Sequence, residues 1–315
     1  MKVKRLVVIS ALFSNSLYSQ ISEQWVLETL RKYSPSSYSI INQYKINGTS
    51  ISFEGSTISS NMEHLEFCKM KDIKSFLSSI STTVHETTHA FDSQIPYILA
   101  KQGLFKFNNF SNEGFIFDEN TKIGYNYPEI KFFQSRELAS VIPENLRTFR
   151  FKTYVVPESN FQSTQSSGII GLLDEFNAYY HGSKVIFDLL PVYKEAYGNN
   201  FLWSWSSDFA SNADAFYEFD FWIKEYLLYA KSNNPALYET LKSDQTFKSI
   251  YKNIRLRFSS LITQYEKKYD EFNTTAQKSN NIIYSSQKHP NLIYPILVDQ
   301  IKSSKYAEIE RYFLN

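Results

Sequence analysis

Apolar residues recur at spacings of three and four between residues 68 and 93, as they do on one face of an amphipathic helix. Neither Gly nor Pro interrupts residues 68–94, so one uninterrupted helix is expected there. The apolar stripe is formed by Phe76, Ile80, Val84, Thr87 and Phe91. A different face carries small and polar side chains, namely Ser78, Ser81, Thr82, His85, His89 and Asp92. A helix with these two faces is suited to line a cleft.

The rest of the chain divides into a mixed N-terminal part and a helical C-terminal part. Residues 21–33 predict a short helix, and residues 38–53 alternate around Asn47-Gly48, a pair typical of a hairpin turn. Strands and turns are expected over residues 103–158, with strands within 114–127, 131–133 and 150–156. Helices are expected at 171–190, 212–230, 235–272 and 295–313, with a local loop at 278–281. The predicted fold class is α+β, with residues 20–168 as the mixed part and residues 169–315 as the helical part.

The N-terminal residues have the pattern of a secretory signal. Residues 1–5 are basic, residues 6–13 are apolar, and small residues follow up to an expected cleavage before Gln20. The apolar run is too short to span a bilayer, and no later stretch approaches the required length. Residues 1–19 are therefore predicted to be a signal peptide, and the mature chain is expected to be secreted or periplasmic, with no integral membrane segment.

Composition narrows the classes of partner. The formal net charge is +1, which gives no electrostatic reason to expect a nucleic acid partner. The 26 Phe and 23 Tyr residues predict a substantial buried core. Because Cys68 is the single cysteine, an internal disulfide is excluded, and the stability of an exported chain must come from that core.

The polar face of the helix over residues 68–93 contains an H-E-x-x-H motif, formed by His85, Glu86 and His89. Side chains four residues apart lie one above the other on a helix, so the two imidazoles can bind one Zn²⁺. Glu86 lies about 100° further round the helix, where it can reach a metal-bound water without being a ligand. This geometry is typical of metal-assisted hydrolysis with Glu86 as general base.

The segment His-Glu-Thr-Thr-His-Ala resembles the zincin metallopeptidases, and its form is close to that of the thermolysin-like gluzincins. The match covers about ten residues of one helix. The chain departs from the metzincin pattern, because Asp92 stands where that family has Gly and Ile95 where it has its third His. The resemblance implies a zincin-like core, a Zn²⁺ cofactor, and a third ligand supplied by a Glu on a later helix. It also implies an edge strand beside the metal helix, for which residues 153–156 are the candidate.

The third ligand is expected at Glu175. This residue shares a face of the helix over residues 171–190 with Leu172, Ala178 and Gly182, which permit another helix to approach closely. An unpaired carboxylate is costly to bury on such a face, and a metal would remove that cost. Glu113 and Asp174 remain alternatives: Asn112-Glu113 is similar to the gluzincin ligand motif but begins an expected hairpin, and Asp174 precedes Glu175 directly.

Four further residues are candidates for supporting roles. The resemblance implies a Tyr or His that stabilises the oxyanion, and Tyr179 is the candidate one turn after Glu175, with Tyr180 and His181 as alternatives. Asp92 is a candidate for a carboxylate that orients His89, or simply a polar residue near the end of its helix.

The leading expectation is a secreted zinc-dependent metallopeptidase that acts on a peptide or protein substrate. Two alternatives stay open. One is a non-catalytic exported binding or surface protein that keeps a zincin-type fold, with the aromatic-rich C-terminal half as its interaction surface. The other is a zinc hydrolase of a non-peptide bond.

Overall fold

The computed structural model describes residues 20–108, 110–278 and 295–315. The predicted signal peptide at residues 1–19 lies outside these residues, as does most of the predicted loop at 278–281. The described chain is mostly helical, with two small antiparallel sheets, which agrees with the α+β class at that level. Among the described residues, no helix combines the length and apolarity needed to cross a membrane.

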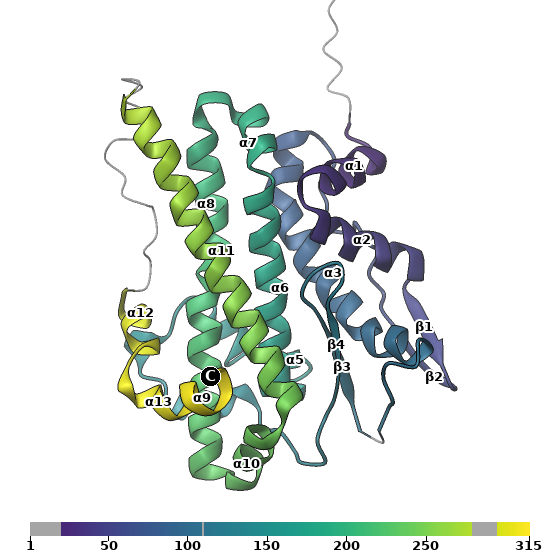
Figure 1. The fold of residues 1–315 in the computed structure, drawn as a ribbon, viewed down its shortest axis with the longest axis vertical. Helices are drawn as coiled ribbons and strands as arrows, with labels where there is room; N and C mark the ends of the chain where they lie inside the picture. Colours follow the sequence, from purple (N-terminus) through teal and green to yellow (C-terminus); the bar gives the residue numbers. More distant parts are fainter. Residues whose placement is uncertain (1–19, 109, 279–294) are drawn as a thin grey trace, which may run out of the picture.

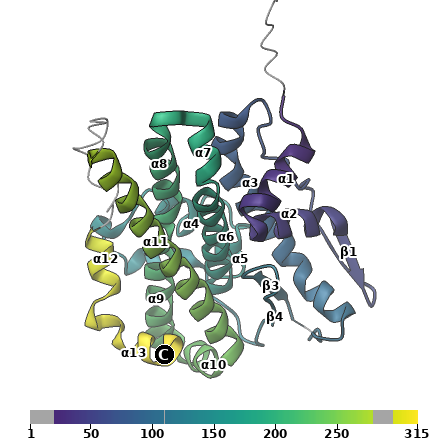
Figure 2. The same ribbon diagram turned by 45° about the horizontal axis from the view of Figure 1, so that its top comes forward.

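The expected helix that carries the H-E-x-x-H motif is α3, Ile73–Lys101. It begins at Asp72, whose side chain accepts a hydrogen bond from the backbone nitrogen of Ser75 at 2.8 Å and so satisfies one of the free amides of the first turn. The helix extends further than its pattern predicts and passes through Pro96. Its length lets it contact both parts of the chain, with α6, Ile169–Asp188, alongside it in both views (Figures 1 and 2).

The N-terminal part packs mainly against α3, and its second hairpin also contacts α6 of the helical part. It contains α1, Glu23–Tyr33, α2, Pro35–Asn47, and two hairpins, formed by β1 with β2 and by β3 with β4. The strands are β1, Ser50–Phe53, β2, Ser56–Ser59, β3, Asn112–Ile116, and β4, Lys122–Asn126. A small apolar cluster joins α2, α3 and β3 through Ile40, Tyr44, Ala90, Phe91, Ile95 and Ile116.

The turn predicted at Asn47-Gly48 is wrong. Residues 35–47 form α2, and Gly48, with φ of 74°, follows the end of that helix. The hairpin instead turns at Glu54 and Gly55, which both have positive φ, so that Ser50 pairs with Ser59 and Phe53 with Ser56. Gly serves equally well after a helix and within a hairpin turn, because both need a left-handed backbone.

The hairpin predicted within residues 114–127 is confirmed: Asn112 pairs with Asn126, and Ile116 with Lys122. The strand predicted at 150–156 is wrong, because Phe151–Tyr154 is the short helix α4. No strand occurs at residues 131–133, where the chain is irregular before a short 3₁₀ helix at Ser135–Ser140. The candidate edge strand at 153–156 is therefore absent as well.

The C-terminal part is helical, as expected. It contains α5, Ser163–Ser166, α6, α7, Leu190–Tyr197, α8, Phe201–Ala213, α9, Ala215–Asn233, α10, Pro235–Ser243, and α11, Gln245–Lys278. The main core lies among α6, α8, α9 and α11, which Figure 1 shows packed side by side. It is rich in aromatic residues. Phe176 of α6, for example, lies 6.2 Å from Phe219 of α9 and 5.7 Å from Phe258 of α11, measured between ring centroids.

The C-terminal segment is not the single helix predicted at 295–313. It consists of α12, Pro295–Ile301, the single turn α13, Ala307–Ile309, and flanking 3₁₀ and π turns. A set of charged side chains, two buried and two partly exposed and called here the C-terminal ion network, holds it against α9 and α11. The fully buried Lys224 lies 3.0 Å from Asp220 and 2.6 Å from Glu310, and Arg255 contacts the same two carboxylates.

Candidate metal centre

His85 and His89 lie one turn apart on the side of α3 that faces α6. The neighbouring threonines are buried without unpaired hydroxyls: Thr87 donates to the carbonyl of Thr83 and Thr88 to that of Val84, each at 2.7 Å. Both threonine hydroxyls are therefore hydrogen-bonded within α3 and need no partner on another element. The two imidazoles are the polar groups of the motif that project toward α6.

The facing residue of α6 is Glu175. Its helix comes close to α3 because Gly182 has no side chain: a Cβ there would lie 3.2 Å from the carbonyl oxygen of Ser81 and 3.7 Å from the Cβ of His85. The close approach inferred from Gly182 is therefore present in the structure. It brings the Glu175 carboxylate, on a residue only 7% exposed, to the two histidines.

The three side chains form what is called here the α3–α6 cluster. The Nε2 atoms of His85 and His89 are 3.1 Å apart, and each lies 3.4 Å from Oε2 of Glu175. All three ligand atoms lie within 4.8 Å of one another, so this group could hold a metal ion. Ligands of a tetrahedral Zn²⁺ at roughly 2.0–2.1 Å would be separated by about 3.4 Å, close to the observed spacing.

The Glu175 carboxylate has the character of a ligand. Its Oε2 atom is buried and, among the described residues, has no hydrogen-bond partner of acceptable geometry. Burial opposes its charge, but the nearby His89 and His85 rings outweigh burial and lower the pKa of Glu175 to about 2. A buried anion aimed at two imidazoles fits a divalent cation, which would supply the missing partner.

Asp174 orients one of the two histidines. Its Oδ2 atom lies 2.8 Å from Nδ1 of His89. If Nδ1 carries the proton and donates it to Asp174, the Nε2 lone pair is directed into the cluster, as a metal ligand requires. Burial opposes a charge on the His89 ring, but the charges of Asp174 and Glu175 outweigh burial and raise the pKa of His89.

The two other acidic candidates have different positions. Asp92 does not contact His89: its carboxylate is fully buried and accepts hydrogen bonds from the Ile116 backbone nitrogen at 2.8 Å and the Asn177 side chain at 2.9 Å. Asp92 therefore joins α3 to β3 and α6, and burial raises the pKa of its carboxyl group.

Glu113 lies outside the α3–α6 cluster. Burial and the nearby charge of Asp174 raise the pKa of Glu113 to about 8.

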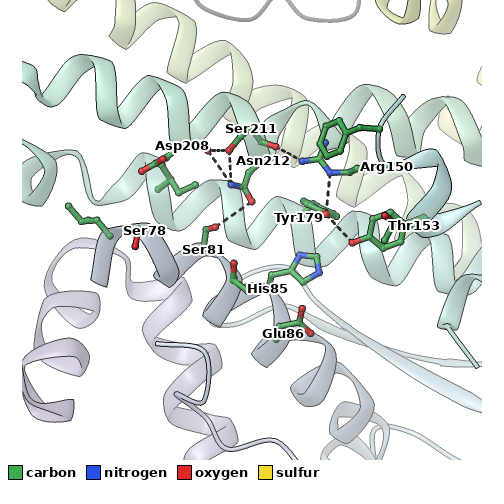
Figure 3. Close-up of a pocket in the computed structure, with 15 residues that line it drawn as sticks. Ser78, Ser81, His85, Glu86, Arg150, Thr153, Tyr179, Asp208, Ser211 and Asn212 are labelled. Atoms are coloured by element: carbon green, nitrogen blue, oxygen red, sulfur yellow. Dashed lines mark hydrogen bonds between the residues drawn. The ribbon is translucent and has the colours of Figure 1, made fainter. Parts of the chain in front are cut away.

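A cavity of about 470 Å³ opens beside the cluster, and Figure 3 shows His85, Glu86 and Tyr179 among the side chains around it. The Tyr179 ring packs edge-on against His85 with 4.5 Å between ring centroids. Its hydroxyl accepts a hydrogen bond from Nε of Arg150 at 3.2 Å and lies 2.9 Å from the hydroxyl of Tyr154. Of the oxyanion candidates Tyr179, Tyr180 and His181, Tyr179 is thus the one that lines the cavity.

His181 has another environment. Its ring is fully buried, its Nε2 atom lies 2.9 Å from the carbonyl oxygen of Ile116 in β3, and it does not line the cavity beside His85. Burial lowers the pKa of His181 to about 4, so the ring is neutral and donates to that carbonyl. Its contacts indicate that His181 positions β3 against α6 and is separate from the cluster.

A second cavity, of about 550 Å³, lies on the other side of Glu86. It is lined by Glu86 and His89 of α3 and by Ile58 and Ser59 of β2. Glu86 therefore borders both cavities, and the strand beside the motif is β2, whereas residues 153–156 were expected in that place. Ligands that extend through the two cavities would pass Glu86 and the cluster.

No family model, curated protein or solved structure matches this chain.

Proposed function

We propose that this protein is a zinc-dependent peptidase of the zincin type, exported by the signal at its N-terminus. The observation that carries the proposal is the α3–α6 cluster: two imidazoles and one buried carboxylate converge within metal-ligand spacing, and in the part of the chain that the structure describes Oε2 of that carboxylate makes no hydrogen bond of acceptable geometry. The donor set of two His and one Glu, with a cavity on either side, is typical of a catalytic zinc site that keeps one position open.

The proposed ligands are His85, His89 and Glu175, with Asp174 holding the ring of His89. A bound Zn²⁺ would act as a Lewis acid at this position. The half-buried Glu86 is the proposed general base: its carboxylate accepts a proton from the attacking water and returns it to the leaving nitrogen. Its place between the two cavities suits this role, because the scissile bond of an extended substrate would lie there.

Tyr179 is the proposed group that stabilises the oxyanion. Its hydroxyl lies at the cavity beside His85 and can donate its proton to the carbonyl oxygen of a substrate as negative charge develops there. A peptide is favoured over a small substrate because the two cavities together extend along α3 on both sides of Glu86.

The decisive test replaces Glu86 with Gln in the zinc-loaded mature protein. The amide keeps the size of the side chain but cannot accept the proton, so hydrolysis of a fluorescence-quenched peptide library should fall by about 10²–10⁴-fold. Zinc content, measured by metal analysis, should stay at the parent value. Glu144→Gln is the matched control, because Glu144 is exposed in a short 3₁₀ turn and lines neither cavity. Equal rates for Glu86→Gln and the parent would rule out the mechanism, and zinc binding without hydrolysis of any peptide would favour a binding protein.

A further inference from the structure

We propose that Arg150 and Tyr154 are positioning residues that direct the proton of the Tyr179 hydroxyl into the cavity beside His85. The inference rests on the proposed function, since it concerns the group that would face the substrate oxygen. Neither residue belongs to the H-E-x-x-H helix or to α6. Arg150 immediately precedes α4, and Tyr154 ends it.

Arg150 is held from three sides. Its Nε donates to the hydroxyl of Tyr179 at 3.2 Å, its Nη1 donates to Glu218 at 2.7 Å, and its Nη2 donates to the backbone carbonyl of Ser211. Arg150 is 5% exposed and Glu218 is fully buried. The guanidinium also lies 4.8 Å from the centroid of the Tyr179 ring (Figure 3). The positive charge is thus fixed against both the hydroxyl and the ring of one residue.

A hydroxyl group has one proton to donate and two lone pairs to accept with. Since Arg150 can only donate, it occupies one lone pair of Tyr179. The Tyr154 hydroxyl lies 2.9 Å away and, among the described residues, has Tyr179 as its hydrogen-bond partner. When Tyr154 donates to Tyr179, both lone pairs of Tyr179 are filled. The Tyr179 proton is then left for an acceptor in the cavity, next to His85.

The free-energy cost of burying Arg150 and Glu218 favours a role for Arg150 beyond packing. A buried Arg–Glu pair gains little net stability over apolar side chains of the same size, because both charges lose their hydration. Here the pair of Arg150 and Glu218 is placed directly behind a cavity-lining hydroxyl. Two donors to the Tyr179 oxygen would also stabilise the negative charge that it takes on as its proton moves toward the substrate oxygen.

The test uses Tyr154→Phe and Arg150→Met, each alone and combined with Tyr179→Phe. We expect Tyr154→Phe and Arg150→Met to lower kcat by about 10-fold or more with little change in KM, because the lost interactions act in the transition state. In the Tyr179→Phe background the same changes should have no further effect, since residues that act through Tyr179 lose their influence with it. An undiminished further loss in that background would overturn the proposal.

A second readout does not depend on activity. A 3-fluorotyrosine at position 179 reports the surroundings of that ring by ¹⁹F NMR, and its resonance should shift or split in Tyr154→Phe and in Arg150→Met. The controls are Arg147→Met and Tyr226→Phe, whose parent side chains donate to backbone carbonyls away from Tyr179. An unchanged resonance in both test variants would overturn the proposal, even if no peptide is hydrolysed and the proposed function fails. Tyr154→Phe removes one hydroxyl only, so it remains informative if Arg150→Met does not fold.

Discussion

Two buried polar groups in this molecule meet the cost of burying charge in different ways. In the C-terminal ion network, the carboxylates of Asp220 and Glu310 face the cations of Lys224 and Arg255, so each charge is balanced within the chain. In the α3–α6 cluster, the Glu175 carboxylate faces two histidine rings, whose charge depends on protonation, instead of the permanent cations of Lys and Arg. The first group is complete as a protein structure, whereas the second is arranged to receive a cation.

The difference predicts which property each group controls. Breaking a balanced buried pair leaves an uncompensated charge and lowers the stability of the fold. Removing the histidines of the α3–α6 cluster takes away two of its three proposed ligands, so ligand binding should be lost in addition to any stability that the rings give to the buried Asp174 and Glu175. Each of the following changes tests one side of this contrast.

The largest effect is expected for the double change His85→Ala and His89→Ala. The parent should bind about one Zn²⁺ per chain, because catalytic sites of this donor set hold a single ion. The double variant should bind none after dialysis, as measured by metal analysis. His64→Ala is the matched control, since His64 pairs with Glu23 away from the cluster. Retention of the ion by the double variant would place the metal elsewhere.

Lys224→Met should lower the free energy of unfolding by about 3–5 kcal/mol, because it leaves Asp220 and Glu310 with Arg255 as their remaining cation. Chemical denaturation measures this change, and zinc content should be unaffected. Lys231→Met, which breaks a partly exposed pair with Glu308, should cost about 0–1 kcal/mol. Equal losses for the two variants would show that burial of the network contributes nothing.

The part of the site that lies within one helix was predictable from sequence. The spacing of His85, Glu86 and His89 defines their relative positions once α3 forms, because a helix fixes the geometry of residues four apart. Glu175 was predicted from the small residues on its helix face, and Gly182 does lie against α3. In both cases the residues lie on one helix, so their spacing in the sequence determines which side chains share a face.

The rest of the site depends on contacts between distant segments. Asp174, and not the nearer Asp92, contacts His89, because the direction of each carboxylate is set by how α6 and β3 pack on α3. Arg150 stands between Phe149 and Phe151 in a segment that was predicted to be a strand, and no repeat in the sequence marks it. Its pairing with Glu218 spans 68 residues and exists only in the folded chain.

Replacement of Asp174 by Asn tests the orienting contact. The amide cannot hold the His89 ring as the carboxylate does, so zinc affinity should fall by about 10–100-fold, as measured by competition with a chelator. Asp92→Asn is the informative comparison, because it lies one turn beyond His89 on α3 but contacts β3 and α6. It should lower stability and leave zinc affinity nearly unchanged. The reverse pattern would assign the orienting role to Asp92.

The smallest effect, and the sharpest separation of binding from folding, is expected for Gly182→Ala. Ala favours a helix over Gly by about 0.8–1.0 kcal/mol, which should stabilise α6. The added Cβ would lie 3.2 Å from the Ser81 carbonyl oxygen, however, so α3 and α6 must move apart by a few tenths of an ångström. These opposing terms should leave the free energy of unfolding nearly unchanged.

Zinc affinity should still fall, because the shift separates Glu175 from His85 and His89 and no protein group can replace the lost contact. If affinity is unchanged and stability rises by the full helical preference, then the close approach at Gly182 does not set the geometry of the cluster.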